Sequence, residues 1–162
     1  MASRVAPAVV QLAILGLWLG AAAFMSVAVA PALFAVLPTR TLAGEVVGRL
    51  LPTVFYSGIV VGVLVIALDA WVAGAWRWSW LTISSLVIAV SCAIAQWIVT
   101  PRIERIRAQI PGAIESLPLD DARRVAFGRL HGISVGWLGL AMLAAVAAFV
   151  VCARALDTRA GA

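Results

Sequence analysis

The sequence predicts an all-α, polytopic membrane protein built as a bundle of four transmembrane helices. Of its 162 residues, 64% are hydrophobic and only 12% are charged, and the mean hydropathy is +1.09. Soluble domains are roughly half apolar and about one quarter charged. A globule of this size cannot bury so large an apolar excess, so most of the apolar surface must face lipid.

The positions of the apolar stretches set the number of spans. A helix needs roughly 20 apolar residues to cross a bilayer. The predicted spans cover residues 8–37, 51–74, 79–100 and 128–153. The alternation of polar and apolar residues that a β-barrel requires is absent. We therefore expect a single membrane domain over residues 1–162.

The N-terminal stretch has some features of a secretory signal peptide. Arg4 precedes an apolar run, and small residues at 21–23 and 28–30 resemble cleavage sites. The apolar run extends well beyond the first site, and Pro31 directly follows the second. We expect the first helix to be retained, and we expect Pro31 to kink or end it.

The third connection, at residues 101–119, is predicted to be an amphipathic cytoplasmic segment. Ile103, Ile106 and Ile110 recur at helical spacing between charged residues, which is typical of a helix lying on the membrane surface. Pro111 and Gly112 interrupt this pattern. The segment from Leu119 to Asp121 then offers an N-cap for the fourth helix, whose charged start should project from the membrane.

Arginine placement predicts the orientation, because cytoplasmic loops carry an excess of basic residues. All twelve basic residues are arginine. Eight of them lie in the first connection (38–51) and in the charged stretch from the third connection to Arg129 (101–129), and the termini and second turn hold four. We expect both connections in the cytoplasm and both termini outside, in a bacterial inner (plasma) membrane. Arginines that flank apolar runs predict contact with the lipid bilayer and no nucleic-acid partner.

Four tryptophans cluster at the second turn, at positions 71, 76, 78 and 80. Tryptophan is enriched at the membrane interface, so an interfacial belt is the simple interpretation and a platform for ligand stacking is the alternative. The two cysteines, Cys92 and Cys152, lie at different predicted depths and are expected to be packing residues.

Small residues at four-residue spacing allow helix backbones to approach closely in lipid. This spacing predicts helix-packing roles for Gly16, Gly20, Gly58, Gly62, Gly128, Gly132 and Gly136. Glycine costs about 1 kcal/mol in a helix interior relative to alanine, so the repeats indicate a packing benefit. These glycine faces can pack against a helix of the same chain or against a second chain. A homo-oligomer and a larger membrane complex are therefore both compatible with the sequence.

Three polar residues inside the apolar stretches are candidates for function. Intramembrane polar groups are costly and often functional. His131, the only histidine, could carry a proton or ligate a metal or haem, but a structural imidazole is the simpler interpretation because partner ligands are scarce. Ser134 shares its helix face. Asp69 lies near the end of its span, where ion coupling and interfacial anchoring are equally reasonable. No catalytic, metal or cofactor motif is present.

Two parts of the sequence carry distinctive motifs. The first holds WLG at residues 18–20, then Phe24, then APALF at residues 30–34, and the second holds PRIERIR at residues 101–107 followed by FGRLHGIS at residues 127–134. Together they resemble the transmembrane-protein-205-like family, an uncharacterised group of four-span proteins. The resemblance implies a four-helix membrane domain and no catalytic assignment. It directs attention to Trp18, Phe24, Pro31, Phe34, Phe127, His131 and Ser134.

The function expected from these features is that of a non-enzymatic membrane protein, either an accessory subunit or a small transport-related protein. The alternative is a redox, metal-binding or haem-binding membrane protein that uses His131 as a ligand.

Overall fold

Four long helical segments form the structure, which confirms the predicted all-α membrane fold. The computed structural model describes residues 2–76 and 78–160. The first segment joins α1 (Ala2–Phe24), a π-helical stretch (Met25–Val29) and α2 (Ala30–Val36), and the second is α3 (Arg40–Ala73). The third joins α4 (Trp80–Ala93), a second π-helical stretch (Ile94–Val99) and α5 (Thr100–Ala108). A 3-10 turn (Ile114–Ser116) precedes the fourth segment, α6 (Ala122–Ala160).

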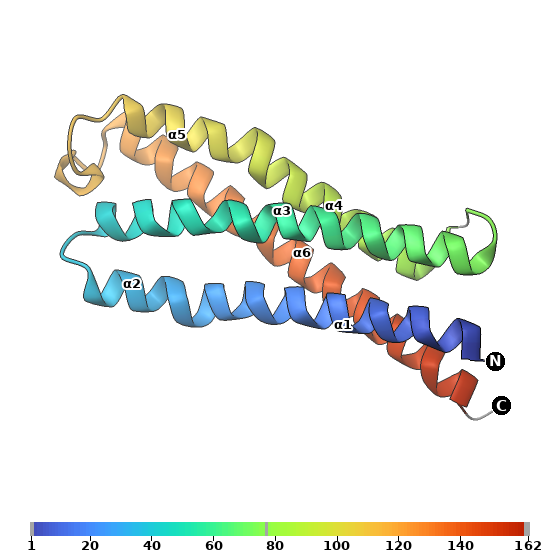
Figure 1. Ribbon diagram of the computed structural model, residues 1–162. Coiled ribbons are helices and arrows are strands. Elements are labelled where there is room, and N and C mark those ends of the chain that lie inside the picture. Colours follow the sequence, from blue (N-terminus) through green and yellow to red (C-terminus); the bar gives the residue numbers. More distant parts are fainter. Residues whose placement is uncertain (1, 77, 161–162) are drawn as a thin grey trace.

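The segments pack as a ring in which α1 contacts α3, α3 contacts α4, α4 contacts α6, and α6 returns to α1. Figure 1 shows that the start of α1, the end of α6 and the α3–α4 turn lie at one end of the bundle. The α2–α3 and α5–α6 connections lie together at the other end. We call this second end the connection end. It is the end that carries most of the arginines.

Local capping residues explain where α3 and α4 begin and where α3 ends. The Thr39 side chain accepts a hydrogen bond from the Leu42 amide, and the Ser79 side chain accepts one from the Thr82 amide. Gly74 ends α3 with φ of 71°, a left-handed conformation that favours glycine. The prediction of a loop over residues 38–51 was wrong, because the Thr39 cap lets α3 start at Arg40 and extend beyond its apolar part.

Pro31 and Pro101 each come directly after a π-helical stretch and the residue that follows it. Proline lacks an amide hydrogen, and its ring clashes with the carbonyl four residues earlier in an α-helix. Before Pro31, the Ala30 amide donates to the Met25 carbonyl, five residues back. Before Pro101, the Thr100 hydroxyl donates to the Ala95 carbonyl at 3.0 Å. The wider turns accommodate both prolines, so the first span continues past Pro31 to Val36.

The helical part of the third connection does not form a separate surface helix. α5 continues the line of α4 and packs against α6 (Figure 1). Only residues 109–121 form the connection proper, as turns and one 3-10 turn. The predicted helical spacing is confirmed for Ile103 and Ile106, which lie in α5, whereas Ile110 lies beyond its end. The packing of α5 against α6 is not visible in the sequence alone.

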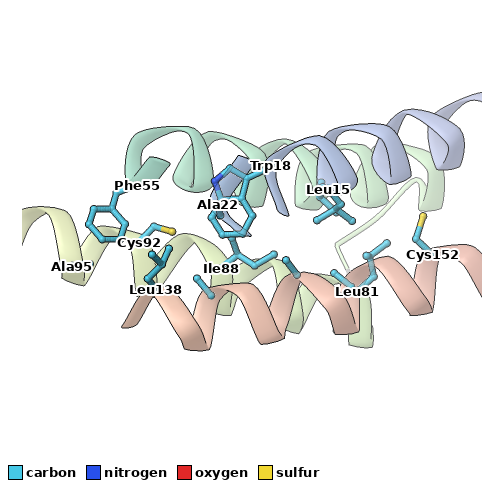
Figure 2. Packing of buried hydrophobic residues seen from close by; sticks show 14 of the residues in the cluster. Leu15, Trp18, Ala22, Phe55, Leu81, Ile88, Cys92, Ala95, Leu138 and Cys152 are labelled. Atoms are coloured by element: carbon cyan, nitrogen blue, oxygen red, sulfur yellow. The ribbon is translucent and has the colours of Figure 1, made fainter. Parts of the chain in front are cut away.

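The core follows a three-then-four spacing on two of the helices. Besides Pro7, the buried positions on α1 are Ala8, Gln11, Leu15, Trp18 and Ala22, and those on α6 are Ser134, Leu138, Ala141, Ala145, Ala148 and Cys152. This spacing is that of helices packed at a shallow angle around a common axis. Figure 2 shows Trp18 of α1 among Phe55, Ile88 and Cys92, which come from α3 and α4. The Trp18 indole also donates to the Val54 carbonyl at 3.0 Å.

The predicted packing glycines differ in whether a neighbouring helix lies against them. A Cβ built on Gly62 would lie 2.6 Å from the Ser85 carbonyl oxygen, and one on Gly58 would lie 2.5 Å from the Cys92 sulfur. These two glycines let α3 and α4 approach closely. A Cβ on Gly16 would approach the Phe149 ring at 3.3 Å. No described atom lies within 4 Å of a Cβ built on Gly20, Gly128, Gly132 or Gly136.

Candidate functional site

A cavity of about 410 Å³ opens at the connection end of the bundle. Its walls come from α2, the first turns of α3, α5, the 3-10 turn and the start of α6. Four sequence-predicted residues line it together: Phe34, Phe127, His131 and Ser134. Residues from the two segments singled out by the family resemblance therefore meet at one place.

Arg107 reaches into the cavity from α5 and lies against α3. A Cβ built on Gly44 would lie 2.9 Å from one terminal nitrogen of this guanidinium, and a Cβ on Gly48 would lie 3.3 Å from the other. Side chains at these two positions would compete with the guanidinium for space. The Gly44 and Gly48 pair thus makes a recess on α3 that Arg107 fills.

Phe127 of α6 supports Arg107 from another side. The Arg107 guanidinium carbon lies 5.4 Å from the centroid of the Phe127 ring, within the range of a cation–π interaction. The Phe127 and His131 rings are nearly parallel, with an interplanar angle of 8° and centroids 6.2 Å apart. One turn of α6 separates the two rings. We call these three residues the Arg107–Phe127–His131 cluster.

The positive charge in the cavity is only partly compensated. Four arginines (Arg40, Arg49, Arg107, Arg124) and three glutamates (Glu45, Glu104, Glu115) line it. None of the four guanidinium groups lies within 4.0 Å of a carboxylate of the described residues. The Arg107 Nε atom is buried and has no hydrogen-bond partner among them. Such a buried donor costs roughly 1–3 kcal/mol when it is left unsatisfied.

Glu115 is already engaged at the start of α3. Its carboxylate accepts hydrogen bonds from the Thr41 hydroxyl and, at 3.4 Å, from the Thr41 amide. These bonds, the hydroxyl first, hold the pKa of Glu115 below its ordinary value. The Thr41 hydroxyl in turn accepts from the Ile114 amide at 3.0 Å. This carboxylate therefore stays negatively charged at neutral pH, but it is held at the α3 N-terminus rather than paired with a guanidinium.

Two arginines in the first turn of α6, Arg123 and Arg124, fix the third connection to that helix. Arg124 donates to the carbonyl of Leu117 at 2.6 Å. Asp121 accepts from the Arg123 amide at 2.8 Å, which confirms the expected cap for α6, and it pairs with the Arg123 guanidinium at 2.8 Å. Hydrogen bonds from Arg123 lower the pKa of the Asp121 carboxyl to about 2. The cavity rim is therefore built from defined contacts.

Asp69 lies at the other end of the bundle, away from the cavity. Its carboxylate accepts hydrogen bonds from the Ser79 hydroxyl at 2.9 Å and from the Thr82 hydroxyl at 3.0 Å. These bonds join the last turns of α3 to the first turn of α4. Of the two roles considered for Asp69, the contacts favour anchoring.

The other predicted residues lie outside the cavity. Trp18 is in the core, whereas Phe24 is 63% exposed on the outer surface of α1. Cys92 and Cys152 are both buried, and the Cys152 thiol donates to the Ala8 carbonyl at 3.4 Å. Arg77, at the tryptophan-rich turn, lies outside the described residues.

Several cavity residues were missed at the level of sequence. Gly44 and Gly48 have the same four-residue spacing as the glycines used for packing, but the sequence predicts a connection at these positions. For Arg107 it predicts only a place in an amphipathic segment. The contact face of α6 was also missed: alanines at positions 141, 145 and 148 form it, and their spacing was the available signal.

A metal site is not evident in the part of the chain that the structure describes. No group of three or more histidine, cysteine, aspartate or glutamate side chains there is close enough to hold a metal ion. A metal or haem at His131 would need ligands from another molecule.

Comparison with protein-family models gives one match. Residues 13–111 match the model described as domain of unknown function (DUF4149), which is more than half of the chain. The chain belongs to this family. The DUF4149 match covers most of the first span, all of the second and third, and Arg107; it ends before α6, which supplies Phe127 and His131 to the cavity. No curated protein and no solved structure matches the chain.

Proposed function

We propose that this DUF4149 protein is a non-enzymatic membrane protein, either an accessory subunit or a small transport-related protein. Its functional site is the cavity at the connection end. The observation that carries this proposal is the gathering of four arginines, three glutamates and His131 around one cavity in an otherwise apolar bundle. Ionisable groups held together at the edge of a membrane domain are typical of a site that meets a ligand or partner.

The resemblance to the transmembrane-protein-205-like family supports the same proposal. Phe34, Phe127, His131 and Ser134 belong to the segments that carry this resemblance, and all four line the cavity. Arginine placement supports a bacterial inner-membrane location with the cavity on the cytoplasmic side and both termini outside.

Orientation is testable with two single-cysteine variants. Leu119→Cys lies in the third connection, where the native side chain is 79% exposed, and Ala75→Cys lies in the exposed second turn. We expect a membrane-impermeant thiol reagent to label Ala75→Cys in intact cells and Leu119→Cys only after lysis. The reverse pattern would place the cavity outside.

The role of the cavity as the functional site is testable by purifying the protein from native membranes in mild detergent and identifying all released molecules by mass spectrometry. We expect a retained small molecule or protein, and we expect Gly48→Leu to lose it, because the added side chain enters the cavity. Gly20→Leu is the matched control, since no described atom lies within 4 Å of a Cβ there. Equal retention by both variants, or none by the native chain, contradicts the proposal.

The ligand-binding alternative for His131 is weaker, because its ring lies parallel to the Phe127 ring and no metal-ligand group surrounds it among the described residues. An optical spectrum and elemental analysis of the same preparation separate the two functions. A stoichiometric metal or a haem band that His131→Ala removes would establish the alternative instead.

Assembly with other chains is also part of the proposal, as a homo-oligomer or within a larger membrane complex. Gly128, Gly132 and Gly136 support it, since no described atom of this chain occupies the space beside them. We expect Gly132→Leu to alter the assembly size in detergent and to leave the fold unchanged. An unchanged size would remove this support.

A further inference from the structure

We propose that the cavity binds a phosphate-type oxyanion, with Arg107 as the residue that anchors it. This inference rests on the proposed function of the cavity and names the chemical class of its ligand. Two sources present this chemistry at a membrane edge: the headgroup of an anionic phospholipid and free phosphate.

The first argument is the state of Arg107. Its Nε atom is buried without a hydrogen-bond partner among the described residues, and its guanidinium has no carboxylate within 4.0 Å in that part of the chain. A buried donor that lacks an acceptor is costly. Guanidinium groups bind phosphate through paired, charge-assisted hydrogen bonds, so an oxyanion would supply the missing acceptors.

The second argument is that the fold holds Arg107 in position. Gly44 and Gly48 leave room for its two terminal nitrogens on α3, and the Phe127 ring lies 5.4 Å from its central carbon. A long cationic side chain is otherwise free to extend into water. The recess and the aromatic ring keep the guanidinium in the cavity, which is the preorganisation that a binding site requires.

The third argument is the charge around Arg107. Four arginines and three glutamates line the cavity, which leaves an excess of one positive charge, and the Glu115 carboxylate is hydrogen-bonded to Thr41 rather than to a guanidinium. Arg40 is the first residue of α3, where the positive end of the helix dipole disfavours a cation. An anion in the cavity relieves both effects.

The remaining lining favours an amphiphile as the source. Apolar side chains of Phe34, Val47, Leu51 and Ile103 line the same cavity as the arginines. An anionic lipid would place its phosphate at Arg107 and its chains along these residues, whereas free phosphate would use only the arginines.

The test measures binding of three probes to the purified full-length protein: phosphatidylglycerol, phosphatidylcholine and inorganic phosphate. Native mass spectrometry reports the lipids, and isothermal titration reports phosphate. Arg107→Gln is compared with Arg105→Gln, which removes the same charge from an exposed position on α5 that does not line the cavity. We expect Arg107→Gln to weaken binding at least tenfold and Arg105→Gln less than twofold.

The probes distinguish the sources. Arg107-dependent binding of phosphatidylglycerol without competition by phosphate identifies a lipid headgroup, and Arg107-dependent binding of phosphate alone identifies the free anion. Equal effects of Arg107→Gln and Arg105→Gln, or phosphatidylcholine binding as tight as phosphatidylglycerol binding, would overturn the assignment. If a different molecule is retained in the cavity independently of Arg107, the proposed function stands and this inference fails.

A second variant keeps the assignment falsifiable if Arg107→Gln does not fold. Phe127→Leu preserves apolar volume and removes the ring beside the guanidinium. We expect it to weaken binding of the anionic probe severalfold, and we expect native binding to fall as salt rises. Binding that neither Phe127→Leu nor salt changes would overturn the role of Arg107.

Discussion

The close approach of α3 to α4 at Gly62 gives the sharpest prediction about stability. A Cβ added at Gly62 would meet the Ser85 carbonyl oxygen at 2.6 Å, the Ala89 Cβ at 2.9 Å and the Ala89 amide nitrogen at 3.0 Å. Two of these atoms are backbone, so rotation of a side chain cannot relieve the clash. Gly62→Ala must therefore move α3 away from α4.

The magnitude follows from the required movement. Ordinary contact begins at 3.4 Å, so the helices must separate by about 0.8 Å at this point. A gap of roughly 0.5–1 Å loses about a quarter to a half of the dispersion attraction across a contact, and overpacking typically costs about 1–3 kcal/mol. The higher helix propensity of alanine offsets about 1 kcal/mol. We expect the free energy of unfolding to fall by up to about 2 kcal/mol.

Gly136→Ala is the matched control, because no described atom lies within 4 Å of a Cβ there. It gains helix propensity without a clash, so its free energy of unfolding should stay the same or rise by up to about 1 kcal/mol. Reversible unfolding in mixed detergent micelles, followed by circular dichroism, measures both variants. If Gly62→Ala is as stable as Gly136→Ala, close packing of α3 on α4 is not what this glycine provides.

Three further predictions concern polar contacts. Trp18→Phe removes the donor to the Val54 carbonyl and should lower the free energy of unfolding by about 1 kcal/mol; no change in mixed-micelle unfolding would contradict this. Asp69→Leu leaves two hydroxyls without their acceptor and should cost about 1–3 kcal/mol, with Asp69→Asn, which keeps an acceptor, as control; equal losses would refute the anchoring role. The pKa of Asp121 is lowered from 3.8 to about 2, so its stabilising contribution is complete above pH 3.8 and is lost as pH falls through 2. Carboxyl NMR titration should show this midpoint, and Arg123→Gln should raise it toward 3.8; an unchanged midpoint would contradict the pairing.

The sequence determined the helical spans and several of their ends. Four apolar stretches of sufficient length specify four spans, because no other structure satisfies the backbone of single apolar segments in lipid. Ser79 and Gly74 mark helix ends through local hydrogen bonding and backbone conformation, which depend on near neighbours only. The sequence does not predict the first turns of α3, because Arg40, Glu45 and Arg49 interrupt the apolar run there.

The tertiary structure alone decided how the faces of these helices are used. Gly58 and Gly62 share their spacing with Gly132 and Gly136, yet only the first pair meets a neighbouring helix within the chain. Spacing identifies a face but does not say what lies against it. The cavity has the same origin: Arg107 and Phe127 lie 20 positions apart in the sequence, and only the packing of α5 on α6 brings the guanidinium to the ring.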